Sequence, residues 1–101
     1  MPTPTLQLRD YLIADGHLDD FVAAWRQHLR PLRERLGFSV DAAWTIPGES
    51  RFVWILVSPG SEAEFEELDR AYYASPDRRG IDPDPAQWIA EARHSFMRPV
   101  D

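Results

Sequence analysis

The segment from Arg51 to Ser58 constrains the fold more than any other part of the sequence, because it is apolar on both sides. Side chains alternate between the two faces of a strand. The apolar ones are Phe52, Trp54 and Leu56 on one face and Val53, Ile55 and Val57 on the other. In an α+β domain the helices cover only one face of the sheet, so a second sheet is the simplest cover for the other face. We therefore expect a homodimer in which two copies of the chain place their sheets face to face.

The remaining elements follow a βαββαβ order, which predicts a ferredoxin-like α+β domain with a four-stranded antiparallel sheet. The predicted strands cover residues 6–13, 38–46, 51–58 and 94–100. The predicted helices cover residues 18–36 and 61–73, and a short third helix opens at Asp84 and carries Trp88, Ile89 and Ala92. The 101 residues have the length of one domain, so we assign residues 1–101 to a single domain.

The helix expected over residues 18–36 carries apolar side chains every three or four residues. They are Leu18, Phe21, Val22, Trp25, Leu29, Leu32 and Leu36. Trp25 lies in the middle of this stripe, so we expect it to be buried against the sheet. Pro31 also lies in this helix and lacks an N–H, which should kink the helix or loosen one of its turns. In the second helix, Ser61 and Glu64 have the spacing of a capping box, and Phe65, Leu68 and Tyr72 form the buried stripe.

Composition excludes several classes of protein. The net charge is −6 and Lys is absent, so the chain lacks the basic surface that nucleic-acid binding requires. Cys is absent as well, which excludes disulfides and thiolate chemistry, and the lack of Lys excludes a Schiff base. The longest apolar run, residues 52–57, is far shorter than the roughly 20 residues that cross a membrane, and the first residues lack the features of a signal peptide. We expect a cytoplasmic protein without nucleic-acid or membrane partners.

Motifs for metal, cofactor or nucleophilic chemistry are missing from the sequence. The three histidines, His17, His28 and His94, do not have the spacing of metal ligands. A glycine-rich phosphate loop and a nucleophile elbow are also missing, so we expect no metal and no cofactor. His28 lies at the edge of the apolar stripe of the first helix and is the histidine best placed for acid–base chemistry.

The turn over residues 47–50 determines how the second and third strands pair. An even number of loop residues pairs even-numbered positions with odd-numbered ones, so Trp44 shares a face with Val53 and Ile55. We assign this face to the helices, together with the leucines of the first strand; an odd loop would reverse the assignment of Trp44. The opposite, open face then carries Gln7, Arg9, Tyr11, Phe52 and Trp54.

Two interpretations of this open face remain. In the first, Arg9 pairs with Asp41 or reaches solvent at the rim of the dimer. In the second, the five side chains line a cavity between the two sheets, which binds a small aromatic, apolar or acidic ligand. Tyr72 is a further candidate ligand-binding residue in the second interpretation, and the candidate catalytic residues are Arg9, Tyr11 and His28.

Several short motifs resemble those of NIPSNAP-like proteins in the dimeric α/β-barrel superfamily. Leu8-Arg9-Asp10-Tyr11 resembles the L-R-x-Y opening of that family. The motifs that follow are Gly16, Leu18-x-x-Phe21-x-x-x-Trp25, Gly37-Phe38, Trp44-Thr45 and Arg51-Phe52-Val53. The resemblance covers about residues 6–70, and it implies the βαββαβ half-barrel and a homodimer without an established reaction. The family often has His where this chain has Trp54, so the resemblance does not imply His-based chemistry at that position.

The sequence leaves two hypotheses for function. The first is a NIPSNAP-like homodimer that binds a small, largely apolar ligand. The second is a cofactor-independent monooxygenase or cyclase of a biosynthetic pathway, acting on an aromatic or polyketide-like substrate. In such an enzyme Arg9 and Tyr11 would polarise an enol or a phenolate, and Trp54 would stack on it.

Overall fold

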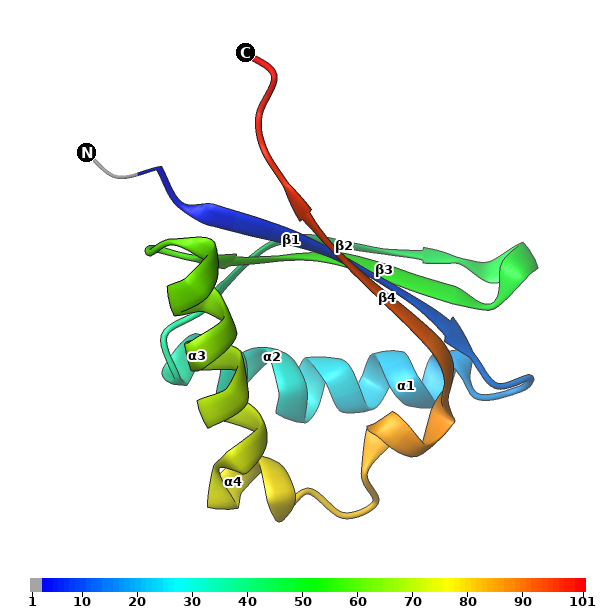
Figure 1. The fold of residues 1–101 in the computed structure, drawn as a ribbon. Helices are drawn as coiled ribbons and strands as arrows, with labels where there is room; N and C mark the ends of the chain where they lie inside the picture. Colours follow the sequence, from blue (N-terminus) through cyan, green and yellow to red (C-terminus); the bar gives the residue numbers. More distant parts are fainter. Residues whose placement is uncertain (1–2) are drawn as a thin grey trace.

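The computed structural model describes residues 3–101 and has the predicted ferredoxin-like α+β fold. The elements are β1 (Thr5–Ile13), α1 (Leu18–Ala24), α2 (Arg30–Arg35), β2 (Ser39–Ile46), β3 (Arg51–Ser58), α3 (Glu62–Ala74), α4 (Pro76–Arg79) and β4 (Ile89–Met97). The strands form one antiparallel sheet in the order β2-β3-β1-β4. All four helices lie on the same side of this sheet (Figure 1), so one face is covered and the other is open.

The first long helix is continuous but changes its winding near the middle. A π-helical turn, Trp25–Leu29, joins α1 to α2. Pro31 lies at the start of α2, where it cannot donate to the carbonyl of the residue four positions earlier and its ring would clash with that carbonyl. The extra residue of a π turn relieves this conflict. The loosened turn that the sequence predicts is therefore confirmed, and Trp25 is buried as expected.

The N-terminal caps follow the sequence closely, whereas the last helix is shorter than predicted. Backbone N–H groups and side chains of Ser61 and Glu64 form the reciprocal capping box at the start of α3, with both hydrogen bonds 3.1 Å long. The predicted third helix is only one 3₁₀ turn, Pro85–Trp88, capped by Asp84. Ile89 and Ala92 belong to β4, because pairing with β1 along this segment replaces the local helical pattern.

The predicted pairing of β2 with β3 is confirmed. Trp44 lies opposite Val53, and Ala43 lies opposite Trp54. One irregularity interrupts β2, because the register shifts between Val40 and Ala42 and leaves a bulge at the exposed residue Asp41.

The assignment of the two sheet faces was wrong. Tyr11, Phe52 and Trp54 lie under the helices, not on the open face, and so do Gln7 and Arg9. The ring of Trp25 is 5.0 Å from that of Phe52 and 5.5 Å from that of Trp54. Large aromatic rings extend from the sheet into the helix layer, where they fill the space between α1 and the strands.

The open face is aliphatic over β2, β3 and much of β1, and it is charged toward β4, where Asp10, Arg51, Glu91 and Arg93 lie. It carries Leu6, Leu8, Leu12, Ala42, Trp44, Ile46, Val53, Ile55 and Val57, which were expected in part under the helices. Trp44, predicted to face the helices, is 52% exposed, and Ile46 is 39% exposed. Within residues 3–101, none of the helices has the length and apolar character that a membrane span requires.

Candidate functional site

Two buried arginines meet at one carboxylate between the sheet and the helices. Arg9 comes from β1 and Arg33 from α2, and their exposed fractions are 0% and 2%. Nη2 of Arg9 lies 3.0 Å from one oxygen of Asp69 on α3, and Nη1 of Arg33 lies 2.6 Å from the other. The Tyr73 hydroxyl accepts hydrogen bonds from both arginines, at 3.1 and 3.3 Å. We call Arg9, Arg33, Asp69 and Tyr73 the arginine cluster.

Aromatic rings surround the guanidinium of Arg33. Its carbon lies 3.5 Å from the ring centre of Tyr72, 4.9 Å from that of Phe38 and 5.9 Å from that of Trp54. Contact with aromatic faces stabilises a buried cation, because the ring quadrupole is negative above the ring plane. These contacts and the carboxylate of Asp69 together make burial of the charge tolerable.

A third arginine approaches from the segment after α3. Arg78 of α4 is 8% exposed, and its Nη2 lies 3.0 Å from the carboxylate of Asp84. This ion pair links α4 to the 3₁₀ turn before β4. We call residues 76–88, which connect α3 to β4 and place the guanidinium carbon of Arg78 5.9 Å from the ring centre of Tyr73, the strap.

A void of about 50 Å³ lies beneath the strap. Its lining consists of Tyr11, Leu29, Arg33, Trp54, Tyr72, Tyr73, Arg78, Ala86 and Ile89. The elements that contribute these residues are far apart in the sequence, and packing of the strap against α3 and the sheet brings them together.

The buried charges alter the protonation of three neighbouring groups. Burial opposes ionisation of Asp69, but Arg9 and Arg33 overcome it and lower the pKa of this carboxyl. Burial raises the pKa of Tyr11, although Arg9 partly offsets this effect. His94 lies opposite Arg9 in the register of β1 and β4, and burial together with Arg9 lowers its pKa. At neutral pH, Asp69 is therefore charged, whereas Tyr11 and His94 are neutral.

Most of the residues proposed from the sequence lie in this region, but not between two sheets. Arg9, Tyr11, Trp54 and Tyr72 surround or adjoin the void, and Gln7 accepts a 2.7 Å hydrogen bond from Nε of Arg9. Phe52 lies farther along the same face, against Trp25 and Phe21. His28 is exposed on the long helix, and in the described part of the chain no hydrogen bond or ring contact links it to the cluster.

The sequence interpretation missed Arg33, Asp69, Tyr73 and Arg78. Arg9 pairs with Asp69 instead of Asp41. A signal was present in the pattern, since Asp69 lies four residues after Phe65 and three before Tyr72, on the apolar stripe of α3. A charged residue on a buried stripe indicates a buried partner of opposite charge.

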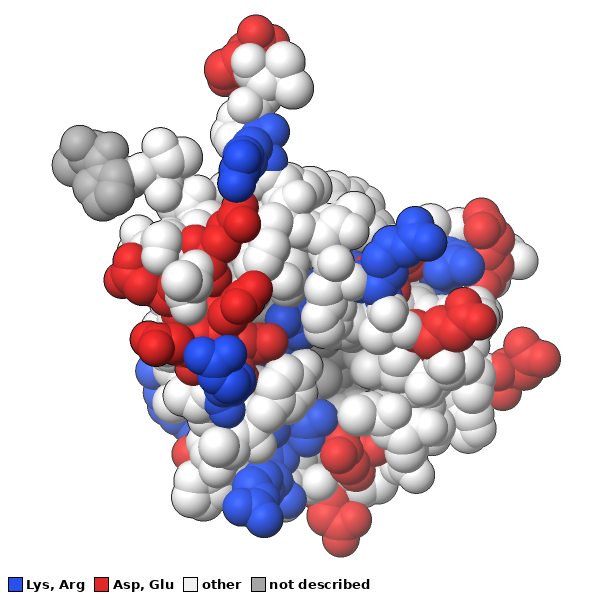
Figure 2. Space-filling view, viewed as in Figure 1, with Lys and Arg blue, Asp and Glu red and all other residues white. Residues whose placement is uncertain are grey.

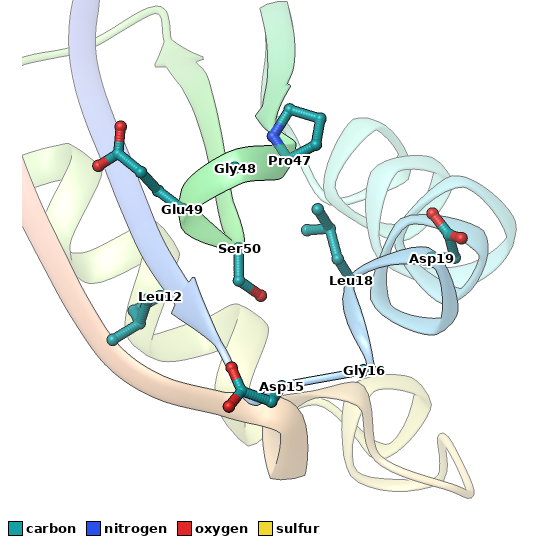
Figure 3. A pocket seen from close by; sticks show the side chains of 9 residues that line it. All are labelled: Leu12, Asp15, Gly16, Leu18, Asp19, Pro47, Gly48, Glu49 and Ser50. Carbon is teal, nitrogen blue, oxygen red and sulfur yellow. The ribbon is translucent and has the colours of Figure 1, made fainter.

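Other surface features have weaker claims to be a site. A groove of about 570 Å³ lies between the β1–α1 loop and the turn before β3, and it is lined in part by Asp15, Asp19 and Glu49. Figure 3 shows that these three carboxylates do not converge. Acidic side chains also gather over α3 (Figure 2). Within residues 3–101, no group of three or more His, Asp or Glu side chains could hold a metal ion.

Solved structures of NIPSNAP proteins have the same fold as this chain. A NIPSNAP family protein from Agrobacterium tumefaciens str. C58 superimposes with a TM-score of 0.86 at 14% identity, covering 100% of this chain and 90% of that one. An uncharacterised NIPSNAP domain protein from Burkholderia xenovorans gives 0.80 at 13% identity, with 94% and 93% covered. The NIPSNAP-like resemblance predicted from the sequence is thus confirmed as a likeness of fold.

The same fold also occurs in a proposed antibiotic biosynthesis monooxygenase from Nitrosomonas europaea. The TM-score is 0.71 at 12% identity, with 99% of this chain and 93% of that one covered. The sequence itself matches no protein-family model and has no significant match among curated proteins.

Proposed function

We propose that the protein is a NIPSNAP-like homodimer that binds a small molecule between its sheet and its helices. The observation that carries this proposal is the burial of Arg33 and Arg78 at a void, with Arg9 buried beside Arg33, in a domain of 101 residues. Buried ion pairs contribute little to stability compared with apolar side chains of the same volume. Three such arginines therefore add little stability to a small core. Binding of a ligand accounts for their presence there.

The site lies on a different face of the sheet from the one that the sequence suggested. Because Arg9, Tyr11 and Trp54 face the helices, the ligand would lie within one subunit and not between two sheets. The roles of Gln7, Phe52 and Tyr72 in binding remain predictions. The dimer and the ligand site are then separate features on opposite faces of the same strands.

The open face supports the dimeric part of the proposal. Trp44 and Ile46 are exposed, and the leucines and β-branched residues beside them are only partly covered. A contiguous apolar surface of this kind is typical of an interface, and a second copy presents a surface of the same shape and chemistry.

Light scattering and fluorescence test the two parts separately. We expect twice the chain mass of 11.7 kDa at micromolar concentration. We also expect a panel of aromatic acids, phenols and quinones to contain ligands that quench the fluorescence of the wild type and of Trp44→Phe, but not that of Trp54→Phe. A monomeric mass would contradict the dimer, and fluorescence unchanged across the panel would contradict the site.

A second candidate function is a cofactor-independent monooxygenase or cyclase. The observation that favours it is the position of His94, a neutral imidazole whose ring centre lies 6.2 Å from that of Tyr11 and which is paired opposite Arg9. A neutral imidazole beside a buried cation can accept a proton from an acidic phenol or enol. Uptake of dioxygen that depends on an added aromatic quinol, and that is lost in His94→Gln, would support a monooxygenase. Absence of such uptake would leave the binding function.

A further inference from the structure

Three side chains around the void have a buried hydrogen-bond donor without an acceptor. The donors are Nε of Arg33, Nε of Arg78 and the indole Nε1 of Trp54. All three side chains are more than nine-tenths buried. Native structures seldom leave such donors unsatisfied, because each has lost its hydrogen bonds to water. Three donors of the side chains that line the void are thus buried without an acceptor.

Arg9 shows what a saturated buried arginine looks like in the same protein. Its Nε donates to Gln7, its Nη1 to Tyr73 and its Nη2 to Asp69. Every nitrogen of Arg9 therefore has a partner, whereas the Nε atoms of Arg33 and Arg78, two residues that line the void, are buried without one. Trp25 Nε1 and Ser58 Oγ are also buried without a partner, but the other three such atoms belong to residues that line the void.

Charge is unbalanced in the same place. Within the described part of the chain, the three buried guanidinium groups form ion pairs with only two carboxylates. Asp69 is shared between Arg9 and Arg33, and the side chain of Asp84 is 52% exposed, so water screens its charge. One positive charge therefore remains in the interior without a counter-charge of its own.

We infer that the void binds the carboxylate of a small aromatic acid, an inference that rests on the proposed function and names the ligand of that site. A carboxylate supplies one negative charge and two acceptor oxygens, which match the surplus of charge and of donors. The void of about 50 Å³ exceeds the ~30 Å³ that one water occupies in the liquid, and it suits a carboxylate group better than a whole aromatic acid.

The ring of the acid then lies toward the surface. Two of the lining residues, Tyr73 and Ala86, are exposed, so the void opens between α3 and the strap. The phenol ring of Tyr73 offers the ligand an aromatic neighbour at this opening. Because the strap carries both Arg78 and Ala86, entry of a ring requires the strap to shift outward while Arg78 keeps its contact with the ligand.

A single water in the void would satisfy the donors but would leave the charge unbalanced. The decisive comparison is therefore between an anion and a neutral molecule of the same shape. We propose calorimetric titration of the full chain with benzoate and with benzamide. Benzoate should bind at least ten-fold more tightly, which is the scale of one hydrogen bond between two charged groups.

Two variants assign the difference to the void. Arg78→Met should weaken benzoate binding about ten-fold and leave benzamide unchanged, whereas Arg79→Met, at the exposed neighbouring position of α4, should alter neither. Trp54→Phe keeps an aromatic ring and removes the indole N–H, so it should weaken benzoate several-fold. This second variant preserves the test if Arg78→Met disturbs the strap.

The outcomes separate the inference from the proposed function. Equal affinity for benzoate and benzamide would overturn the preference for an anion and leave a small-molecule site. Absence of binding by either compound would overturn the inference, whereas the proposed small-molecule site is overturned only if the fluorescence panel also contains no ligand. Benzoate binding that neither Arg78→Met nor Trp54→Phe weakens would place the anion elsewhere and overturn the assignment to the void.

Discussion

The two faces of the sheet carry different kinds of side chain, and the buried charges lie on the face that the helices cover. The covered face carries Gln7, Arg9 and most of the aromatic rings of the strands, whereas the open face carries leucine, valine and isoleucine together with Trp44 and, toward β4, several charged residues. The buried charges are tolerated because α2 and α3 supply their partners. The apolar side chains of the open face have no helix over them (Figure 1), and its charged residues Asp10 and Arg51 pair with each other. The difference teaches that charge is buried on this sheet where the helices supply partners for it, so hydrophobicity alone does not identify the covered face.

Truncation of Trp25 should have the largest effect on stability. The ring contacts Phe52 and Trp54 on the covered face, so Trp25→Ala should lower the free energy of unfolding by about 3–5 kcal/mol. Denaturant titration measures this loss, with Val100→Ala, at a fully exposed apolar residue outside the sheet, as the control. A loss below about 1 kcal/mol for Trp25→Ala would contradict the described packing.

Removal of the shared carboxylate should have the next largest effect. Asp69→Asn leaves Arg9 and Arg33 buried without an ionic partner, and we expect a loss of about 3 kcal/mol. The control is Asp77→Asn, which breaks the exposed ion pair with Arg35 and should cost less than about 1 kcal/mol. Similar losses for both variants would show that the cluster does not depend on Asp69.

A charge on the open face tests whether that face has a partner. Ile55→Glu places a carboxylate in the middle of the aliphatic surface, opposite the helices. If a second copy covers this surface, light scattering should show the mass falling from two chains to one, while circular dichroism stays unchanged. A dimer that persists in Ile55→Glu would require another interface.

The smallest effect should be a dependence of stability on pH that comes from His94. Burial and Arg9 lower its pKa below the usual value of 6.5, so the unfolded chain binds the proton more readily than the folded chain. Stability should therefore fall as the pH decreases below about 6.5, and His94→Gln should flatten this part of the profile. Asp69 contributes separately at more acidic pH, because its lowered pKa means that its stabilising effect is lost only below about 3.8.

Local signals in the sequence were sufficient for most of the fold. The bounds of β3, the capping box of Ser61 and Glu64, and the loosened turn near Pro31 all depend on residues that are close together in the chain. The pairing of β2 with β3 depends on one short turn and was also predictable. The length of the last helix was not, because β1 pairs with this segment from the other end of the chain.

The face of the sheet could not be predicted in the same way. Both sides of β3 are apolar, so its alternation does not indicate a direction. In β1, either the leucines or the set that contains Arg9 had to lie under the helices. The partner that stabilises Arg9 there is Asp69, which is 60 residues farther along the sequence. The alternation of side chains along each strand therefore places the site residues correctly on one face of the sheet. It does not show whether that face is the open one or the one that the helices cover.

The bulge at Asp41 has a consequence for how molecules of this protein meet. β2 forms one edge of the sheet, and an edge strand with a regular backbone accepts strands from other molecules one after another. The bulge twists the backbone at that edge and places a carboxylate there, which makes it a poor template. Association through the aliphatic faces stops when two chains have met, because each chain has one such face. Pairing between sheet edges could add further chains without limit. Asp41 thereby favours assemblies of finite size over open-ended growth.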